Sequence, residues 1–293
     1  MFNMIKGGNK MKSLKKIIAT VISSVLLVGT LAGCGEADAT DSKNIKIGVC
    51  PGPYGEMVEK AITPYLEEKG YKVEVVNFTD YVQPDQALAS GEIDANLMQH
   101  TVYLEKFAAD NNLKISSVIE VPTAGAGVFS NSIKSFDELK SGDKVAIPTD
   151  AVNLARSLRL IRDLGVIKIK DNIDETKATT ADISENKNSL EFVTIDAAQI
   201  SRSLDSVAIG VIPGNYAIAA NLKFEDALGV EKLAKGFKNV VAVKTEDLDS
   251  DLGKDLKAAV ESEKFYDAIT AEGSTFKAFD RPDWWIEKYG KDK

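Results

Sequence analysis

The fold is decided by residues 45–98, which read IKIGVCPGPYGEMVEKAITPYLEEKGYKVEVVNFTDYVQPDQALASGEIDANLM. Ile45–Cys50 alternates apolar and polar side chains, which predicts a strand, and Pro51-Gly52-Pro53 ends it. The pattern then predicts a helix, a strand, a short helix and a third strand, at 57–69, 71–78, 84–90 and 93–98. Strands that alternate with helices are typical of an α/β fold with parallel sheets.

The same order of elements recurs later in the chain. Gln83 and Leu88, which precede the strand at Ile93, have counterparts in Gln199 and Leu204, both 116 residues further on. Such a repeat predicts two similar α/β lobes. Because loops at the carboxyl ends of parallel strands collect ligand contacts, we expect a binding cleft between the lobes.

The start of the chain indicates export. Three lysines, at 12, 15 and 16, precede an uncharged run from Ile17 to Thr30, and Leu31-Ala32-Gly33-Cys34 follows. This is typical of a secretory signal peptide, here residues 1–33, and the run is shorter than the ~20 residues of a membrane-spanning helix. Leu-Ala-Gly-Cys resembles the bacterial lipobox, which implies lipidation of Cys34. The alternative is an ordinary signal peptide with a chance cysteine.

Composition excludes several function classes. Loss of residues 1–33, with five lysines and no acid, changes the formal charge from −8 to −13, which argues against nucleic acid as a partner. One histidine and Cys50 cannot form a zinc cluster, and with Cys34 acylated Cys50 has no disulfide partner. Hydrolase, phosphate-loop and metalloprotease motifs do not occur. We therefore predict no metal, no cofactor, no catalytic residues and no enzymatic activity.

Two residues in a strand-end loop that runs into a helix, Asn153 and Arg156, could bind a carboxylate. They are three apart and so share one helical face, and a guanidinium near a helix start suits an anion. The alternative is a surface arginine paired with Asp150 or Asp163.

Other candidates lie at strand ends. His100 is either a polar contact or a buried capping histidine, and Asn215 is either a ligand contact or a helix N-cap. Tyr81, Met98 and Tyr103 could form a polarisable wall around a ligand side chain, or could simply belong to the core.

Several motifs resemble the NlpA/MetQ-type lipoproteins, the methionine-binding components of bacterial ABC importers. The motifs are Asp80-Tyr81-Val82-Gln83-Pro84, Ala95-Asn96-Leu97-Met98-Gln99-His100, Asn153 with Arg156, Ala197-Ala198-Gln199-Ile200-Ser201-Arg202-Ser203-Leu204-Asp205 and Gly214-Asn215-Tyr216-Ala217. The resemblance covers nearly all of residues 45–280. It implies a type II periplasmic-binding-protein-like fold that closes on an amino acid.

The resemblance also implies roles. Arg156 would bind the α-carboxylate, Asn153 and Asn215 the amino-acid backbone, and Tyr81, Met98, His100 and Tyr103 would line the pocket. The partners would be an ABC permease with its ATPase, and the lipid bilayer through acylated Cys34, at the extracytoplasmic face of the cell membrane.

The expected domains are a signal peptide (1–33), a flexible tether (34–44), a first lobe (45–127 and 238–293) and a second lobe (128–237). The chain departs from the family pattern at Tyr54, Met98, Val102, Thr149 and 122–127. Because most of these positions lie on strand-end loops, other ligands stay open as alternatives. They are a methionine-containing dipeptide or another small amino acid, and further alternatives are an extracytoplasmic hydrolase or a surface interaction protein.

Overall fold

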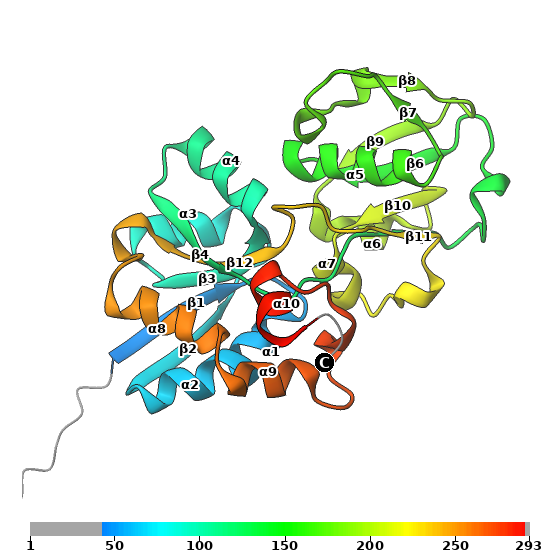
Figure 1. Cartoon of the computed structure of the whole chain (residues 1–293). Coiled ribbons are helices and arrows are strands. Elements are labelled where there is room, and N and C mark those ends of the chain that lie inside the picture. The colour runs from blue at the N-terminus through cyan, green and yellow to red at the C-terminus, as the bar shows by residue number, and fades with distance from the viewer. Residues whose placement is uncertain (1–42, 291–293) are drawn as a thin grey trace, which may run out of the picture. The chain divides into compact units, whose positions relative to one another are not determined.

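The computed structural model describes residues 43–290, which form two five-stranded sheets (Figure 1). Cys34 and the expected signal peptide lie outside the described residues. The first sheet has the order β2-β1-β3-β12-β4, with bounds Tyr71–Asn77, Lys43–Val49, Ala95–His100, Asn239–Lys244 and Ile115–Glu120. Strands β1, β2 and β3 are parallel, and β12 is antiparallel to both of its neighbours. We call this sheet and its helices the first lobe.

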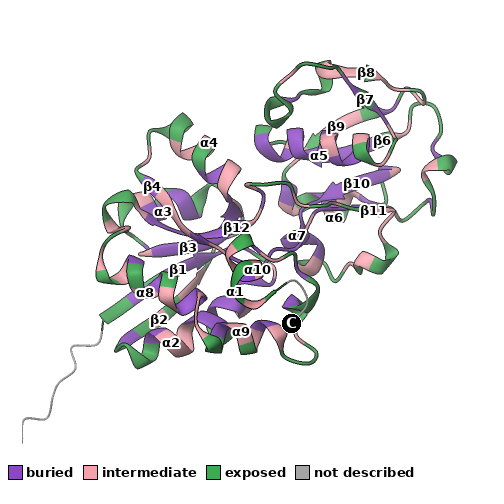
Figure 2. Cartoon of the chain, in the orientation of Figure 1, coloured by how far each residue is buried: buried purple, intermediate pink, exposed green. Residues whose placement is uncertain are grey.

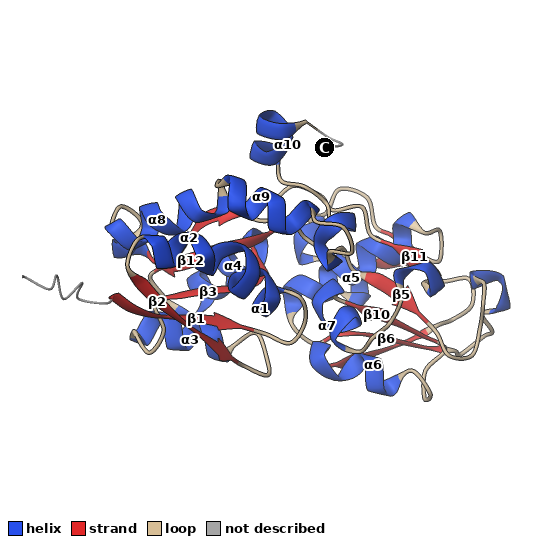
Figure 3. Ribbon diagram, turned by 90° about the horizontal axis from the view of Figure 1, so that it is seen from below, coloured by secondary structure: helices blue, strands red, loops and turns tan. Residues whose placement is uncertain are grey.

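Helices cover both faces of the first sheet (Figure 3). Both faces need cover because both carry apolar side chains. In strand β12 the side chains alternate between two separate hydrophobic cores, one on each face of the sheet. Val241 and Val243 pack on one face, among residues of the helices α8 (Asp251–Val260) and α9 (Glu263–Thr270). Val240 and Ala242 pack on the other, with residues of α3 (Gln83–Ser90) and α4 (Thr101–Asn111). Both faces of β12 are therefore buried (Figure 2).

The predicted helix over 57–69 is longer and less regular than expected. It runs through α1 (Tyr54–Met57), a π-helical turn (Val58–Ile62) and α2 (Thr63–Glu68). Pro64 lacks an N–H and its ring would clash with a carbonyl one turn earlier, so the wider π turn relieves the conflict.

The second sheet has the order β11-β5-β10-β6-β9, with bounds Gly229–Val230, Gly127–Phe129, Ile209–Ile212, Lys144–Pro148 and Glu191–Ile195. The helices α5 (Ala151–Asp163), α6 (Ile200–Ser203) and α7 (Gly214–Ala219) cover it, and a small β7–β8 ribbon (Lys168–Ile169 and Ile183–Glu185) lies beside it. We call this sheet and its helices the second lobe.

The two lobes share one topology. In each sheet one strand, β1 or β6, lies between two strands that run parallel to it: β2 and β3 beside β1, and β9 and β10 beside β6. A strand of the opposite direction pairs with the other side of β3 and of β10: β12 in the first lobe and β5 in the second. The predicted two-lobed α/β fold is confirmed. What the two lobes repeat is the order and direction of the strands within each five-stranded sheet.

The chain crosses between the lobes twice, at 121–126 and at 231–238. Gly127, which sequence analysis placed at the end of the first lobe, is the first residue of β5 in the second sheet. Strand β1 likewise includes Lys43 and Asn44, which were expected in the tether, because both pair with β2. Along residues 43–290, no helix is long and apolar enough to span a bilayer.

The last helix, α10 (Asp283–Tyr289), is part of the first-lobe core. Trp285 is 1% exposed and its ring packs against Phe265, Tyr266 and Tyr289. Its neighbour Trp284 is half-buried and donates from Nε1 to the carbonyl oxygen of Glu120 at 2.8 Å.

Replacement of Trp285 by alanine should lower the free energy of unfolding by about 3–5 kcal/mol, since it removes a large buried ring from a closed core. Trp284→Phe, which keeps a ring and removes one hydrogen bond, should cost only about 1 kcal/mol. Urea titration of both variants measures the difference. Equal costs would contradict the central position of Trp285.

Candidate ligand-binding site

One pocket contains all seven residues that sequence analysis selected as a ligand site. Its empty volume is about 320 Å³, which includes space open to solvent. Its lining comes from both lobes and from the first crossover: Tyr54, Tyr81, Met98, Gln99, His100, Tyr103, Ala124, Asn153, Arg156, Pro213, Gly214, Asn215 and Asn239. The centre of a water molecule can move in only about 20 Å³ of it, so the walls lie close together.

The start of α5 positions Asn153. Asp150 caps the helix by accepting from the Asn153 backbone N–H at 2.9 Å. The same carboxylate accepts from Asn153 Nδ2 at 3.2 Å, which fixes the amide so that Oδ1 points away from Asp150. Asn153 Oδ1 is therefore free to accept from His100 and Arg156.

Arg156 is buried and paired with a residue that sequence analysis did not select. Its Nη2 donates to Glu231 Oε2 at 2.6 Å, and its Nε donates to Glu231 Oε1 at 2.9 Å. The two side chains are only 7% and 5% exposed. The alternative of a surface arginine paired with Asp150 or Asp163 is wrong, since Asp163 pairs with Arg162.

Both members of this pair are charged. Burial favours the neutral form of Glu231, but the charge and hydrogen bonds of Arg156 outweigh it and lower the pKa of the carboxyl. For Arg156, burial acts to lower the pKa, and the carboxylate of Glu231 outweighs it, so the pKa is raised.

His100 is both a helix cap and a contact between the lobes. Its Nδ1 accepts from the backbone N–H of Tyr103 at 3.2 Å, so the proton lies on Nε2. Nε2 then donates across the cleft to Asn153 Oδ1, 3.3 Å away. Burial, together with the nearby charge of Arg156, lowers the pKa of His100 well below 6.5. The imidazole is therefore neutral at pH 7.

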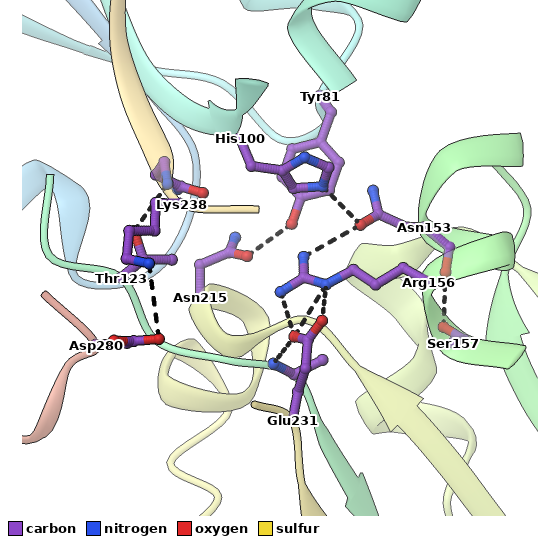
Figure 4. Close-up of polar contacts among 12 residues, drawn as sticks. Tyr81, His100, Thr123, Asn153, Arg156, Ser157, Asn215, Glu231, Lys238 and Asp280 are labelled. Carbon is purple, nitrogen blue, oxygen red and sulfur yellow. Dashed lines mark hydrogen bonds and ion pairs between the residues drawn. The ribbon is translucent and has the colours of Figure 1, made fainter. Parts of the chain in front are cut away.

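Asn215 makes the second contact between the lobes. It lies inside α7, and its side chain does not cap that helix. Its Oδ1 accepts from the hydroxyl of Tyr81 at 2.6 Å, and its Nδ2 donates to the carbonyl oxygen of Pro51 at 3.0 Å. Figure 4 shows Asn215 and Tyr81 next to the guanidinium of Arg156. The simple N-cap alternative for Asn215 is wrong.

Aromatic rings and a thioether form the rest of the wall. Met98 and Tyr103 are buried, and the Tyr81 ring lies 5.7 Å from Tyr103 and 5.1 Å from Tyr216. Burial raises the pKa of Tyr54 to about 12. That phenol therefore stays protonated, and the wall carries no negative charge from it.

Gln99 and Asp85 form a buried polar pair beneath the pocket. Gln99 lines it and donates from Nε2 to Asp85 Oδ1, which also accepts from Asn96 Nδ2 at 2.9 Å. Among the described residues, neither Gln99 Oε1 nor Asp85 Oδ2 has a hydrogen-bond partner. Burial raises the pKa of Asp85 to about 7, against the hydrogen bonds from Asn96 and Gln99.

Sequence analysis did not select two residues of the site, Gln99 and Glu231. Gln99 stands beside His100 at a strand end, so its position was a usable signal. Glu231 lies 75 residues from Arg156 in an irregular crossover, and no local pattern indicates it.

Cys50 is a buried free thiol, as predicted. In residues 43–290 no cluster of histidine, cysteine and acidic side chains could hold a metal ion.

This arrangement can hold a small polar molecule and release it. Donors and acceptors from both lobes meet around a buried guanidinium, and both crossovers lie beside it. A pocket between two lobes of this topology defines a two-lobed substrate-binding protein of the periplasmic-binding-protein type.

The chain belongs to the NlpA lipoprotein family, which it matches over residues 45–280. It is 38% identical over 256 residues to the probable D-methionine-binding lipoprotein MetQ of Vibrio cholerae, with 86% of this chain and 93% of that protein covered. It is 37% identical to the D-methionine-binding lipoprotein MetQ of Escherichia coli K12, with 83% and 90% covered. A nutrient-binding protein from Burkholderia cenocepacia bound to methionine superposes with a TM-score of 0.74 at 37% identity, covering 79% of this chain and 98% of that one.

Asp85 should make stability depend on pH. Its pKa rises from 3.8 in the unfolded chain to about 7 in the folded one, so the folded state holds this proton more tightly between these values. The contribution of Asp85 to the free energy of unfolding is fully present below pH 4 and is lost as the pH rises through 7. The total loss is up to about 4 kcal/mol. In Asp85→Asn, which keeps the amide contacts, that loss should disappear.

Urea titrations at pH 4, 6 and 8 measure the free energy of unfolding of both proteins. Asp110→Asn, at an exposed position, is the control and should keep the wild-type slope. An unchanged pH slope in Asp85→Asn would show that the carboxyl does not titrate in this range.

Proposed function

We propose that this protein is the methionine-binding lipoprotein of an ABC importer. The buried guanidinium of Arg156, in a pocket made by both lobes, carries the proposal. The family membership and the names of the relatives support it. Binding and release are the whole of this function, with no chemical step.

The ligand's carboxylate would bind Arg156. Glu231 occupies Nε and one side of Nη2, so the end of the guanidinium formed by Nη1 and Nη2 faces away from that pair. Among the described residues Nη1 donates only to Asn153 Oδ1, at 3.4 Å. A carboxylate could accept two parallel hydrogen bonds there, and charge-assisted pairs of this kind are the strong ones.

The side chain of methionine suits the remaining wall. Met98, Tyr54, Tyr81 and Tyr103 present a thioether and aromatic rings, and sulfur packs favourably against such groups. Micromolar binding needs only about −8 kcal/mol, which one ion pair, a few hydrogen bonds and one buried side chain can supply.

The anchor and the partners complete the proposal. Lipidation of Cys34 would supply two acyl chains, enough for stable attachment at the extracytoplasmic face of the membrane. The tether would let the two lobes reach an ABC permease and its ATPase, which would respond to the closed, ligand-bound form.

Calorimetry with L- and D-methionine tests the proposal. Wild type should bind at least one isomer, and Arg156→Ala should weaken binding more than 100-fold, because the carboxylate loses its charged partner. Arg162→Ala is the control, since Arg162 lies on the same helix and pairs outside the pocket.

Because Arg156→Ala leaves Glu231 buried without its partner, Asn215→Ala provides a second variant with no change of charge. It should weaken binding at least tenfold while circular dichroism stays native. No binding of either isomer by wild type at millimolar concentration would contradict the proposal, and binding of another amino acid or of a dipeptide instead would assign a different ligand.

Gly52 should matter for closure of the lobes. It has φ +126°, and a Cβ there would lie 2.6 Å from the backbone oxygen of Asn215 in the other lobe. Gly52→Ala should therefore hold the lobes apart and raise the methionine Kd at least tenfold, because ligand contacts from both sides could not form together.

Gly70→Ala is the matched control for Gly52→Ala. Gly70 also has a positive φ, +82°, but a Cβ there meets nothing within 4 Å. Both variants should lose stability from backbone strain, roughly 1–2 kcal/mol for the left-handed region. Only Gly52→Ala should lose affinity, and equal losses of affinity would exclude a role in closure.

A further inference from the structure

Glu231 stands where the ligand site meets both crossovers. It follows the last residue of β11 and begins the crossover back to the first lobe. Its Oε2 accepts from the backbone N–H of Ala126, on the other crossover, at 2.9 Å. The carboxylate therefore holds both connecting segments and Arg156 at once (Figure 4).

The pairing also decides which donors of Arg156 remain for a ligand. A guanidinium has two forks: a lateral one formed by Nε and Nη2, and a terminal one formed by Nη1 and Nη2. Glu231 takes the lateral fork with bonds of 2.6–3.0 Å. The guanidinium plane is therefore fixed, and the terminal fork is left for the pocket.

The charges beside the pocket cancel before any ligand enters. The charged side chain in the pocket lining is Arg156, and Glu231 balances it. His100 adds no charge because it is neutral. A ligand with a carboxylate but no ammonium would therefore bring one uncompensated negative charge into a buried site, which is costly.

An ammonium group would restore the balance. Gln99 lines the pocket with an Oε1 that has no partner among the described residues, so a neutral acceptor is present for it. The ligand that fits both the donors and the charge balance is a zwitterion.

We propose that Glu231 is a positioning residue that orients Arg156 and, by supplying its counter-charge, makes the pocket select ligands with no net charge. This inference rests on the proposed methionine-binding function and assigns its charge selectivity to one side chain outside the pocket lining.

The test compares two ligands of nearly equal shape at pH 6. One is methionine, and the other is its 2-hydroxy analogue, in which a hydroxyl replaces the ammonium and leaves one net negative charge. Wild type should bind methionine at least 100-fold more tightly. Glu231→Gln keeps the side-chain length but removes the charge. In this variant the Kd of the hydroxy analogue divided by the Kd of methionine should be at least tenfold smaller than in wild type.

Glu175→Gln is the control, because Glu175 pairs with another arginine of α5, Arg162, at the surface. It should leave both Kd values within twofold of wild type. Circular dichroism and thermal unfolding check that Glu231→Gln folds, since loss of a partner can destabilise a buried arginine.

Each outcome is decisive. If wild type binds the hydroxy analogue within tenfold of methionine, charge selection is excluded whatever the variant does. If Glu231→Gln folds and weakens both ligands by the same factor, Glu231 has only a structural role and the proposal is overturned. If wild type binds no methionine, the proposed function falls, and the selectivity with it.

Discussion

The buried ion pair between Arg156 and Glu231 is the constraint on which the rest of the site depends. A guanidinium removed from water needs a counter-charge, and only a carboxylate held by the fold can supply one before a ligand arrives. Glu231 meets that need from a crossover and is itself held by the amide of Ala126. The cation that we propose as the partner of the ligand's carboxylate is thereby connected to both crossovers between the lobes.

A frame of neutral polar groups extends outward from this pair. Asn153 accepts from Arg156 and from His100, so it links the cation to the first lobe. Asn215 and Tyr81 make a second link across the cleft. Because every group in this frame other than the ion pair is neutral, the lobes can part without exposing new unpaired charge. Opening therefore costs hydrogen bonds that water can replace.

The sequence predicted local features well and long-range ones poorly. Local patterns in the sequence indicate the strand at Ile45–Cys50, through its alternation, and the left-handed glycine after the helix that ends near Lys69. The internal repeat predicted a second lobe of the same kind. The seven pocket residues were found largely through family motifs, since spacing alone left Arg156 and His100 undecided. Glu231 was not found, because its role comes from a tertiary contact with Arg156 and no periodic pattern surrounds it.

The order of strands along the chain also sets an order of assembly. Strand β12, Asn239–Lys244, lies between β3 and β4, whereas every strand of the second sheet is complete by Val230. Until the chain is synthesised as far as β12, the first sheet therefore lacks the strand between β3 and β4, whereas the second sheet can already form. The second lobe is inserted in the chain between two parts of the first lobe, so the lobe whose synthesis begins first is completed last. Until β12 is synthesised, β4 has no strand partner and its backbone hydrogen-bonding groups stay unpaired.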